Sequence, residues 1–217
     1  PDLPIWITES GASTYTGELE TNFPPFTYEE QAINMMRTLV IAEADESIKA
    51  LIIHRLNEVN HSNDVEARFG FLGIERNAKP AYVALSNANQ LMQGFSPEAN
   101  LTNVKESYES RLVSEYAFYD EVKNDYLFAL WTNGRLGSTA TLNIQVDNSV
   151  NAPLWNIQES NKNATLNLTV PSGFDYKMID MYGQTDGVIF FRYQSLNQSK
   201  NLFILARTVL LKKYRRT

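Results

Sequence analysis

The 217-residue sequence contains no cysteine and only two histidines. Without cysteine the chain has no disulfide framework, no thiol nucleophile and no thiolate metal site, although this composition is still compatible with secretion. Basic residues are fewer than acidic ones, 19 against 25, and the formal net charge of -6 argues against nucleic acid as a partner. The apolar runs are also short, well below the roughly 20 residues that cross a membrane as a helix. We therefore expect a globular protein that binds neither nucleic acid nor membrane.

Sequence motifs for several kinds of chemistry are missing as well. The glycine-rich motifs that hold nucleotide phosphates and the G-x-S-x-G motif of serine hydrolases do not occur. His61, Asp64 and Glu66 lie in a polar stretch, but their spacing matches no recognised metal site. We predict neither a metal nor a cofactor.

The first 94 residues combine short apolar runs with helical periodicity. Residues 3–8 and 48–54 are nearly continuous apolar runs, which are typical of buried parallel strands. Apolar residues recur at three- and four-residue spacing over residues 28–46, which predicts an amphipathic helix. A second helix is predicted over residues 80–93, with proline in its first turn. The order strand, helix, strand, helix predicts an α/β domain over residues 1–94.

In the second half of the sequence the apolar residues have a different spacing. After residue 100, apolar and polar residues alternate with the two-residue period of half-buried strands, and turn clusters separate the runs. This pattern predicts an antiparallel β-sandwich or small barrel over residues 104–217, after a linker at residues 95–103. The predicted fold class is therefore α/β plus all-β.

Glu9 is the first candidate for chemistry, because it ends the first predicted strand and is followed by Ser10 and Gly11. Ligands bind outside the carboxyl ends of parallel strands, and the catalytic residues of α/β barrels lie there. A carboxylate in this place is suited to act as a nucleophile or a base. From position alone, a loop or helix-capping carboxylate is the plainer interpretation.

The residues around Glu9 resemble a known family. Residues 4–11, with the sequence PIWITESG, look like strand seven of the clan A glycoside hydrolases, the (β/α)8-barrel enzymes related to cellulases and β-xylosidases. Residues 28–39 are similar to the helix after that strand, and residues 50–56 resemble strand eight. Residues 69–73, followed by residues 79–85, match the closing segment that leads into the last barrel helix. The chain thus resembles the C-terminal part of a TIM barrel.

The β-rich half carries a resemblance too, since residues 130–134 and 178–183 are similar to the β-sandwich appended to several of these families. What the resemblance implies is retaining hydrolysis of O-glycosidic bonds in a polysaccharide or oligosaccharide, with Glu9 as the nucleophile. Such enzymes need a second carboxylate about 5–5.5 Å from the first, which serves as acid and then as base. In the family that glutamate ends strand four, and no residue of this chain is assigned to it.

Two strand–helix units cannot close a barrel, because closure needs about eight tilted strands. We therefore hypothesise that the chain is a fragment or one segment of a larger or split enzyme, with the remaining barrel segment of the same protein as its partner. The chain alone is expected to be inactive. The resemblance also favours a secreted or periplasmic location.

Five further residues are candidates for contact with a carbohydrate substrate. His54 and Arg55 end the predicted strand eight, where the family commonly has an aromatic residue. His54 is suited to hydrogen-bond a sugar hydroxyl and Arg55 to pair with a carboxylate, while a purely structural network at the strand end is about equally compatible. Tyr15, together with Phe23 and Phe26 in the same loop, is suited to stack on a pyranose ring, although loop packing is the plainer interpretation.

Two tryptophans are expected to lie in the core rather than in a sugar site. Trp6 precedes Glu9 by three positions, so the two side chains point to opposite faces of the strand. Trp131 shares a strand face with Leu127 and Ala129, which also predicts burial.

Two other interpretations remain open at this point. In the first, the β-rich half is a non-catalytic carbohydrate-binding or interaction module, and the α/β half is a remnant. In the second, the chain is a complete small α/β-plus-β protein with no connection to glycans. Binding of a polysaccharide by residues 101–217 alone would favour the first of them.

Overall fold

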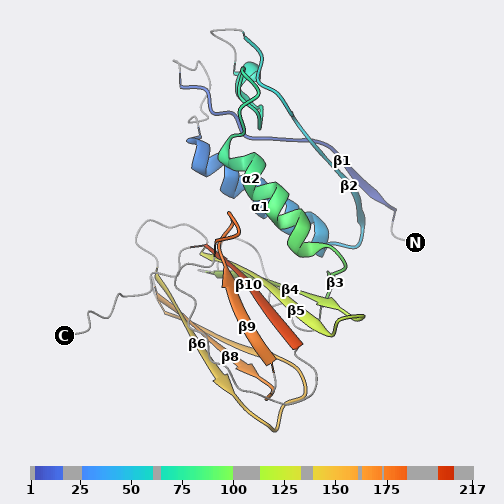
Figure 1. Cartoon of the computed structure of the whole chain (residues 1–217), viewed down its shortest axis with the longest axis vertical. Helices are drawn as coiled ribbons and strands as arrows, with labels where there is room; N and C mark the ends of the chain where they lie inside the picture. The colour runs from blue at the N-terminus through green and yellow to red at the C-terminus, as the bar shows by residue number, and fades with distance from the viewer. Residues whose placement is uncertain are drawn as a thin grey trace, which may run out of the picture. The chain divides into compact units, whose positions relative to one another are not determined.

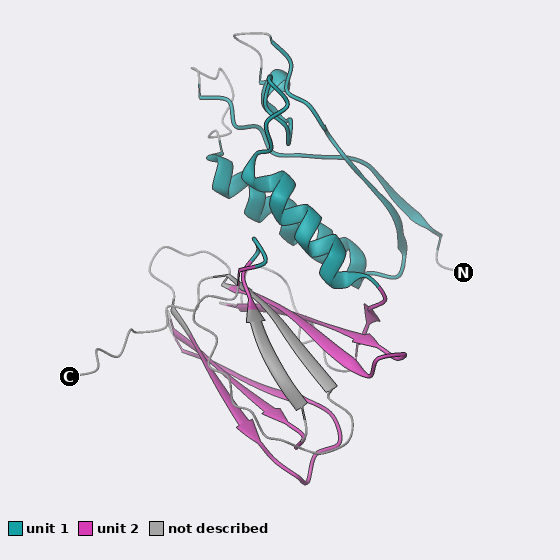
Figure 2. Cartoon of the chain, in the orientation of Figure 1, with its two compact units in different colours: residues 1–93, 181–183 teal, residues 94–180, 184–217 magenta. Residues whose placement is uncertain are grey.

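The computed structural model describes residues 3–16, 26–60, 65–99, 113–132, 139–160, 163–172, 174–184 and 200–207. The chain divides into two compact units (Figure 2). The first unit comprises residues 1–93 and 181–183, and the second comprises residues 94–180 and 184–217. Among the described residues, no helix has the length and hydropathy to span a membrane.

The first unit is built from two strands and two α-helices (Figure 1). Its elements in chain order are β1 (Ile5–Ser10), α1 (Tyr28–Ala44), β2 (Ile48–Ile53), the short 3-10 helix η1 (Glu66–Arg68) and α2 (Pro80–Met92). Strands β1 and β2 pair in parallel, with Ser10 opposite Ile53 at their carboxyl ends. The predicted order of strand, helix, strand, helix and the parallel pairing are confirmed.

Local sequence explains where the two helices begin. Thr27 and Glu30 form a capping box at the start of α1, in which each side chain accepts a hydrogen bond from the other residue's backbone N–H. Pro80 occupies the first turn of α2, where its missing N–H costs no helical hydrogen bond. The two helices pack through a core that is rich in small side chains, among them Ala32, Met35, Leu39, Ala81, Ala84, Leu85 and Ala88.

The strands of this unit are more exposed than their sequence predicts. Leu51 and Ile53 pack against the helical core, but Ile52 is 51% exposed and Ile5 is 48% exposed. Trp6 is 65% exposed, so the expectation that it lies in the core is wrong, as is the expectation that both strands are buried. The reason is that β1 and β2 form a sheet of two strands only, and the described residues supply no cover for its second face.

The second unit contains two β-sheets (Figure 1). One sheet has the order β3 (Ser96–Pro97), β4 (Val113–Asp120), β5 (Asp125–Thr132), β10 (Lys200–Arg207) and β9 (Phe174–Ile179). The other has the order β6 (Thr139–Val146), β8 (Asn163–Val170) and β7 (Leu154–Ser160). Because β3 pairs with β4, part of the segment predicted to be a linker, residues 95–103, is a strand of this unit.

Both sheets contribute to one hydrophobic core. Alternate residues of β4 and β5, such as Val113 and Phe128, pack together with Leu166 and Leu168 of β8. Trp131 is 6% exposed, which confirms that it lies in the interior. The alternation identified the buried face of β8, whereas β4 and β5 are buried on both faces, so Trp131 lies on the side of β5 opposite to Phe128.

The directions of the strands differ from the prediction of antiparallel pairing throughout. Strand β10 is parallel to both β5 and β9, and β6 is parallel to β8. The pairs β4–β5 and β7–β8 are antiparallel, so both sheets are mixed. A two-residue period reports which face of a strand is buried, but it carries no information on the direction of the neighbouring strand.

Candidate functional site

The carboxyl ends of β1 and β2 meet at one edge of the first unit, and this edge carries Glu9 and His54. The backbone N–H of His54 donates a hydrogen bond to the carbonyl oxygen of Ser10 over 2.8 Å. Gly11 follows at once, and a Cβ atom at this position would collide with the carbonyl oxygen of His54. Glycine is therefore needed for the two loops to approach each other beside Glu9.

His54 lies between two carboxylates. Its Nδ1 atom is 3.5 Å from Oε1 of Glu9, and its Nε2 atom is 3.3 Å from Oε2 of Glu66. The imidazole is only 27% exposed, whereas the side chains of Glu9 and Glu66 are 67% and 62% exposed. The ring also meets Phe69 edge to face, with 5.3 Å between the ring centroids. The histidine is thus held from three sides, while the Glu9 carboxylate reaches into solvent.

This geometry is suited to a carboxylate, here that of Glu9, that reacts with a bound ligand. A carboxylate that is exposed at a strand end is open to a ligand, and a neighbouring imidazole N–H helps to fix its orientation. Of the residues predicted for the site, the structure brings Glu9 and His54 together.

Arg55 and Tyr15 lie nearby in the chain but have other contacts. The Nε atom of Arg55 donates to the carbonyl oxygen of Asn57 over 3.0 Å, and its Nη2 atom is buried without a partner among the described residues. Tyr15 is half-buried, and its backbone N–H donates to Oγ of Ser13 over 3.3 Å. The described residues show no contact of Arg55 or Tyr15 with Glu9, and no carboxylate partner for Arg55.

Of the aromatic residues named with Tyr15, Phe26 packs against the helical core and Phe23 lies outside the described residues.

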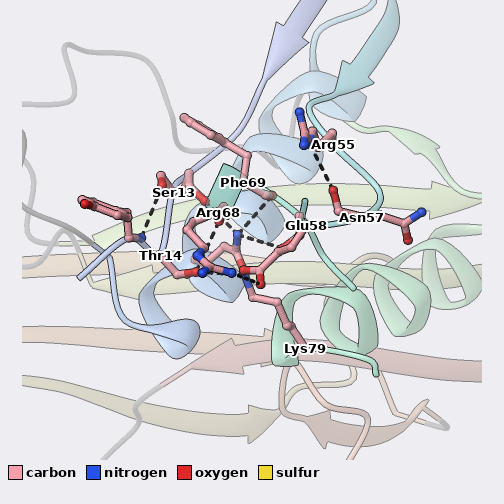
Figure 3. Close-up of polar contacts among 12 residues, drawn as sticks. Ser13, Thr14, Arg55, Asn57, Glu58, Arg68, Phe69 and Lys79 are labelled. Atoms are coloured by element: carbon pink, nitrogen blue, oxygen red, sulfur yellow. Dashed lines mark hydrogen bonds and ion pairs between the residues drawn. The ribbon is translucent and has the colours of Figure 1, made fainter. Parts of the chain in front are cut away.

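A buried polar cluster lies at the base of the same loops (Figure 3). Nζ of Lys79 donates to Oγ1 of Thr14 over 2.9 Å and to Oε1 of Glu58 over 3.0 Å. Nη1 of Arg68 donates to the other oxygen of Glu58 over 3.2 Å. The side chains of Lys79 and Glu58 are 2% and 5% exposed. The cluster ties together the loops after β1 and β2, η1 and the residue that precedes α2.

Burial has an electrostatic effect on this cluster. Desolvation lowers the pKa of Lys79 from its ordinary value, and the hydrogen bond to Glu58 opposes that shift. The aromatic ring of Tyr28 lies 4.8 Å from the same Nζ atom and gives it a further favourable contact. From helix α1, Nε2 of Gln31 donates to the carbonyl oxygen of Ala12 over 2.7 Å. The loop that follows Glu9 is thereby anchored at several points.

Glu66 is the residue of the site that sequence reasoning missed, since it was considered only as a weak metal ligand. No signal along the chain pairs it with His54, because the contact between the two side chains forms only in the folded structure. His61 and Asp64, its companions in that consideration, lie outside the described residues. The part of the chain that the structure describes contains no cluster of three potential metal ligands.

No protein-family model and no curated protein sequence matches the chain. The chain is similar to a family 39 glycoside hydrolase from the gut symbiont Bacteroides cellulosilyticus WH2, with a TM-score of 0.50 and 17% sequence identity. The similarity covers 77% of this chain and 32% of that one, so the chain spans about a third of that protein's length. Family 39 belongs to clan A, and the likeness is one of fold.

Proposed function

We propose that this chain is the C-terminal portion of a retaining glycoside hydrolase, with Glu9 as its nucleophile. The observation that carries the proposal is the position of Glu9, an exposed carboxylate at the carboxyl end of a parallel strand with an imidazole 3.5 Å away. The fold likeness to part of a family 39 glycoside hydrolase supports it. The substrate class is a polysaccharide or oligosaccharide with an O-glycosidic bond.

The chemistry assigns the first step to Glu9. Its carboxylate attacks the anomeric carbon, the bond to the leaving oxygen breaks, and the acid partner gives that oxygen a proton. The sugar is then held as an ester on Glu9. In the second step the partner, now a base, takes a proton from water, and the water oxygen displaces Glu9 from the anomeric carbon. The partner carboxylate belongs to another segment of the proposed enzyme, and no residue of this chain is assigned to it.

The exposed apolar side chains of β1 and β2 support the proposed partner segment. Ile5, Trp6 and Ile52 on this sheet of two strands are each about half exposed or more, as is Leu3, which precedes β1. Burying a fully exposed large apolar side chain contributes about 1.5–3 kcal/mol, so covering these partly exposed side chains contributes a fraction of that for each. We propose that the remaining strands of the barrel cover these residues, and that the chain alone has no glycosidase activity.

The direct test of the proposal is covalent trapping. The complete protein is treated with fluoroglycoside inactivators of the gluco and xylo configurations, which form a glycosyl ester that hydrolyses slowly. Mass spectrometry is expected to find the added sugar on the peptide that contains Glu9, and the E9Q variant is expected to stay unlabelled. A label on a different carboxylate would contradict the assignment of Glu9.

Two roles are proposed for His54, orienting Glu9 or hydrogen-bonding the sugar, and the variants H54F and H54N distinguish between them. If its Nδ1–H orients Glu9, then H54F removes the donor but keeps a ring against Phe69, and kcat falls about tenfold or more while KM changes little. H54N keeps a donor near the Nδ1 position, so it is expected to restore part of kcat. If His54 instead hydrogen-bonds the sugar in ground and transition state alike, KM rises and kcat stays. Steady-state kinetics of the complete protein decides between the two, and unchanged kcat in H54F would contradict the orienting role.

Arg55 and Tyr15 are proposed as further sugar-contacting side chains. Their support is their place in the loops that leave the same strand ends as Glu9 and His54. The buried Nη2 of Arg55, which has no partner among the described residues, is an additional donor at that edge.

A further inference from the structure

The outer face of the three-stranded sheet β6–β8–β7 has an unusual composition. On one side of this sheet, Leu142, Ile144, Leu166 and Leu168 pack in the core of the second unit. The side chains between them alternate to the opposite face. Eight of these are amides or hydroxyls, namely Thr141, Asn143, Gln145, Asn156, Gln158, Thr165, Asn167 and Thr169. We call these eight residues the amide face.

The strand register arranges the amide face in rows. Asn143 of β6 and Asn156 of β7 both lie opposite Asn167 of β8, so three asparagines stand side by side across the sheet. Thr141 of β6 and Gln158 of β7 flank Thr165 of β8 in the next row. Neighbouring strands in a sheet are about 4.8 Å apart, and successive residues on one face about 6.8 Å apart. The result is a regular grid of hydrogen-bonding groups.

Two cross-strand hydrogen bonds hold the grid in place. Nδ2 of Asn143 donates to Oδ1 of Asn167 over 2.9 Å, and Nε2 of Gln145 donates to Oγ1 of Thr169 over 2.8 Å. These bonds leave the carbonyl oxygens of Asn143 and Gln145 and the amide group of Asn167 to contact a ligand. Side chains that are ordered before binding lose less conformational freedom when a ligand arrives.

None of the eight residues carries a charge, although 20% of the whole sequence is charged. Covering a charged group without pairing it costs much more than covering a neutral polar group. An uncharged face therefore suits an uncharged ligand and offers little attraction to nucleic acid or to an anionic polymer. Amides and hydroxyls both donate and accept hydrogen bonds, as sugar hydroxyls do. Leu154, 48% exposed in the row of Thr169, adds an apolar contact for the C–H side of a sugar ring.

We propose that the amide face is a binding site for a neutral polysaccharide chain, separate from the site at Glu9. The occupant is argued from the match between an uncharged grid of donors and acceptors and an uncharged polymer of hydroxyl groups. This inference does not rest on the proposed glycosidase activity, because it concerns residues of the second unit only.

The test is affinity electrophoresis of the 217-residue chain in native gels. The gels contain hydroxyethyl cellulose, arabinoxylan or the anionic polymer polygalacturonate. We expect at least one neutral polysaccharide to retard the chain and polygalacturonate to leave its migration unchanged. In the double variant N143A/N167A the dissociation constant from the retardation is expected to rise at least tenfold. The variant N151A, in the exposed turn between β6 and β7, is the matched control and is expected to migrate like the unaltered chain.

A further variant makes the result decisive. T165V replaces a hydroxyl by a methyl group of similar shape, so it tests the face even if the double variant fails to fold, and it is expected to weaken binding several-fold. The proposal is overturned if neither neutral polymer retards the chain, if polygalacturonate alone does, or if T165V binds unchanged. It is also overturned if size-exclusion chromatography shows that the face joins two copies of the chain.

Discussion

The variant E9Q of the complete protein is expected to lose glycosidase activity almost entirely. Glutamine has nearly the shape of glutamate but cannot form the glycosyl ester, so we expect kcat to fall by at least about 10³-fold, in line with the removal of nucleophiles in other enzymes. That loss corresponds to roughly 4 kcal/mol of activation free energy. The fall in kcat is measured with an aryl glycoside as substrate, whose hydrolysis is monitored through the phenol that it releases. Thermal unfolding is expected to stay the same because the Glu9 side chain is mostly exposed.

A matched control and a rescue experiment make this result specific. Glu43 is an exposed glutamate of α1, and E43Q is expected to keep full activity. In E9A the space left by the side chain admits azide, and added azide is expected to restore cleavage with inversion at the anomeric carbon. If E9Q retains activity, or if azide gives the same anomer as the unaltered enzyme, Glu9 is not the nucleophile.

The features that could be predicted from the sequence depend on short stretches of chain. Helix α1 was predicted over residues 28–46 and spans Tyr28–Ala44, because its apolar spacing and its capping residues are local signals. Helix α2 was predicted over residues 80–93 and spans Pro80–Met92 for the same reason. The place of Glu9 at a strand end also follows from a local pattern, an apolar run that stops at a polar residue and a glycine.

The features that could not be predicted depend on residues far apart in the sequence. Lys79 meets Thr14 across 65 positions, and nothing in the residues that flank either one signals the contact. Strand β6 pairs with β8 rather than with β7, which the alternation of apolar residues cannot reveal. The exposure of Trp6 depends on how many strands lie beside β1. The number of neighbouring strands is set by the whole fold and not by the sequence of β1 itself.

The second large effect is expected for K79M, which removes the buried cation of the polar cluster. Breaking a buried ion pair costs about 3–5 kcal/mol because the remaining charge is left without its partner. Arg68 still pairs with Glu58, so we expect the lower end of that range, about 3 kcal/mol. The midpoint of thermal unfolding is then expected to fall by roughly 6–12 °C, at about 2–4 °C per kcal/mol for a chain of this size. The exposed Lys49 provides the control, and K49M is expected to leave the midpoint unchanged.

The dependence on pH gives an independent measure of the same lysine. Burial lowers the pKa of Lys79 below its ordinary value of 10.5, so between the lowered pKa and 10.5 the unfolded chain binds more protons than the folded chain. The free energy of unfolding therefore gains a contribution that rises with pH in this interval. K79M lacks that contribution, and the gap in stability between it and the unaltered chain is expected to widen as pH increases there. Denaturant unfolding at several alkaline pH values measures the gap, and a gap that narrows would show that Lys79 is not held as a desolvated cation.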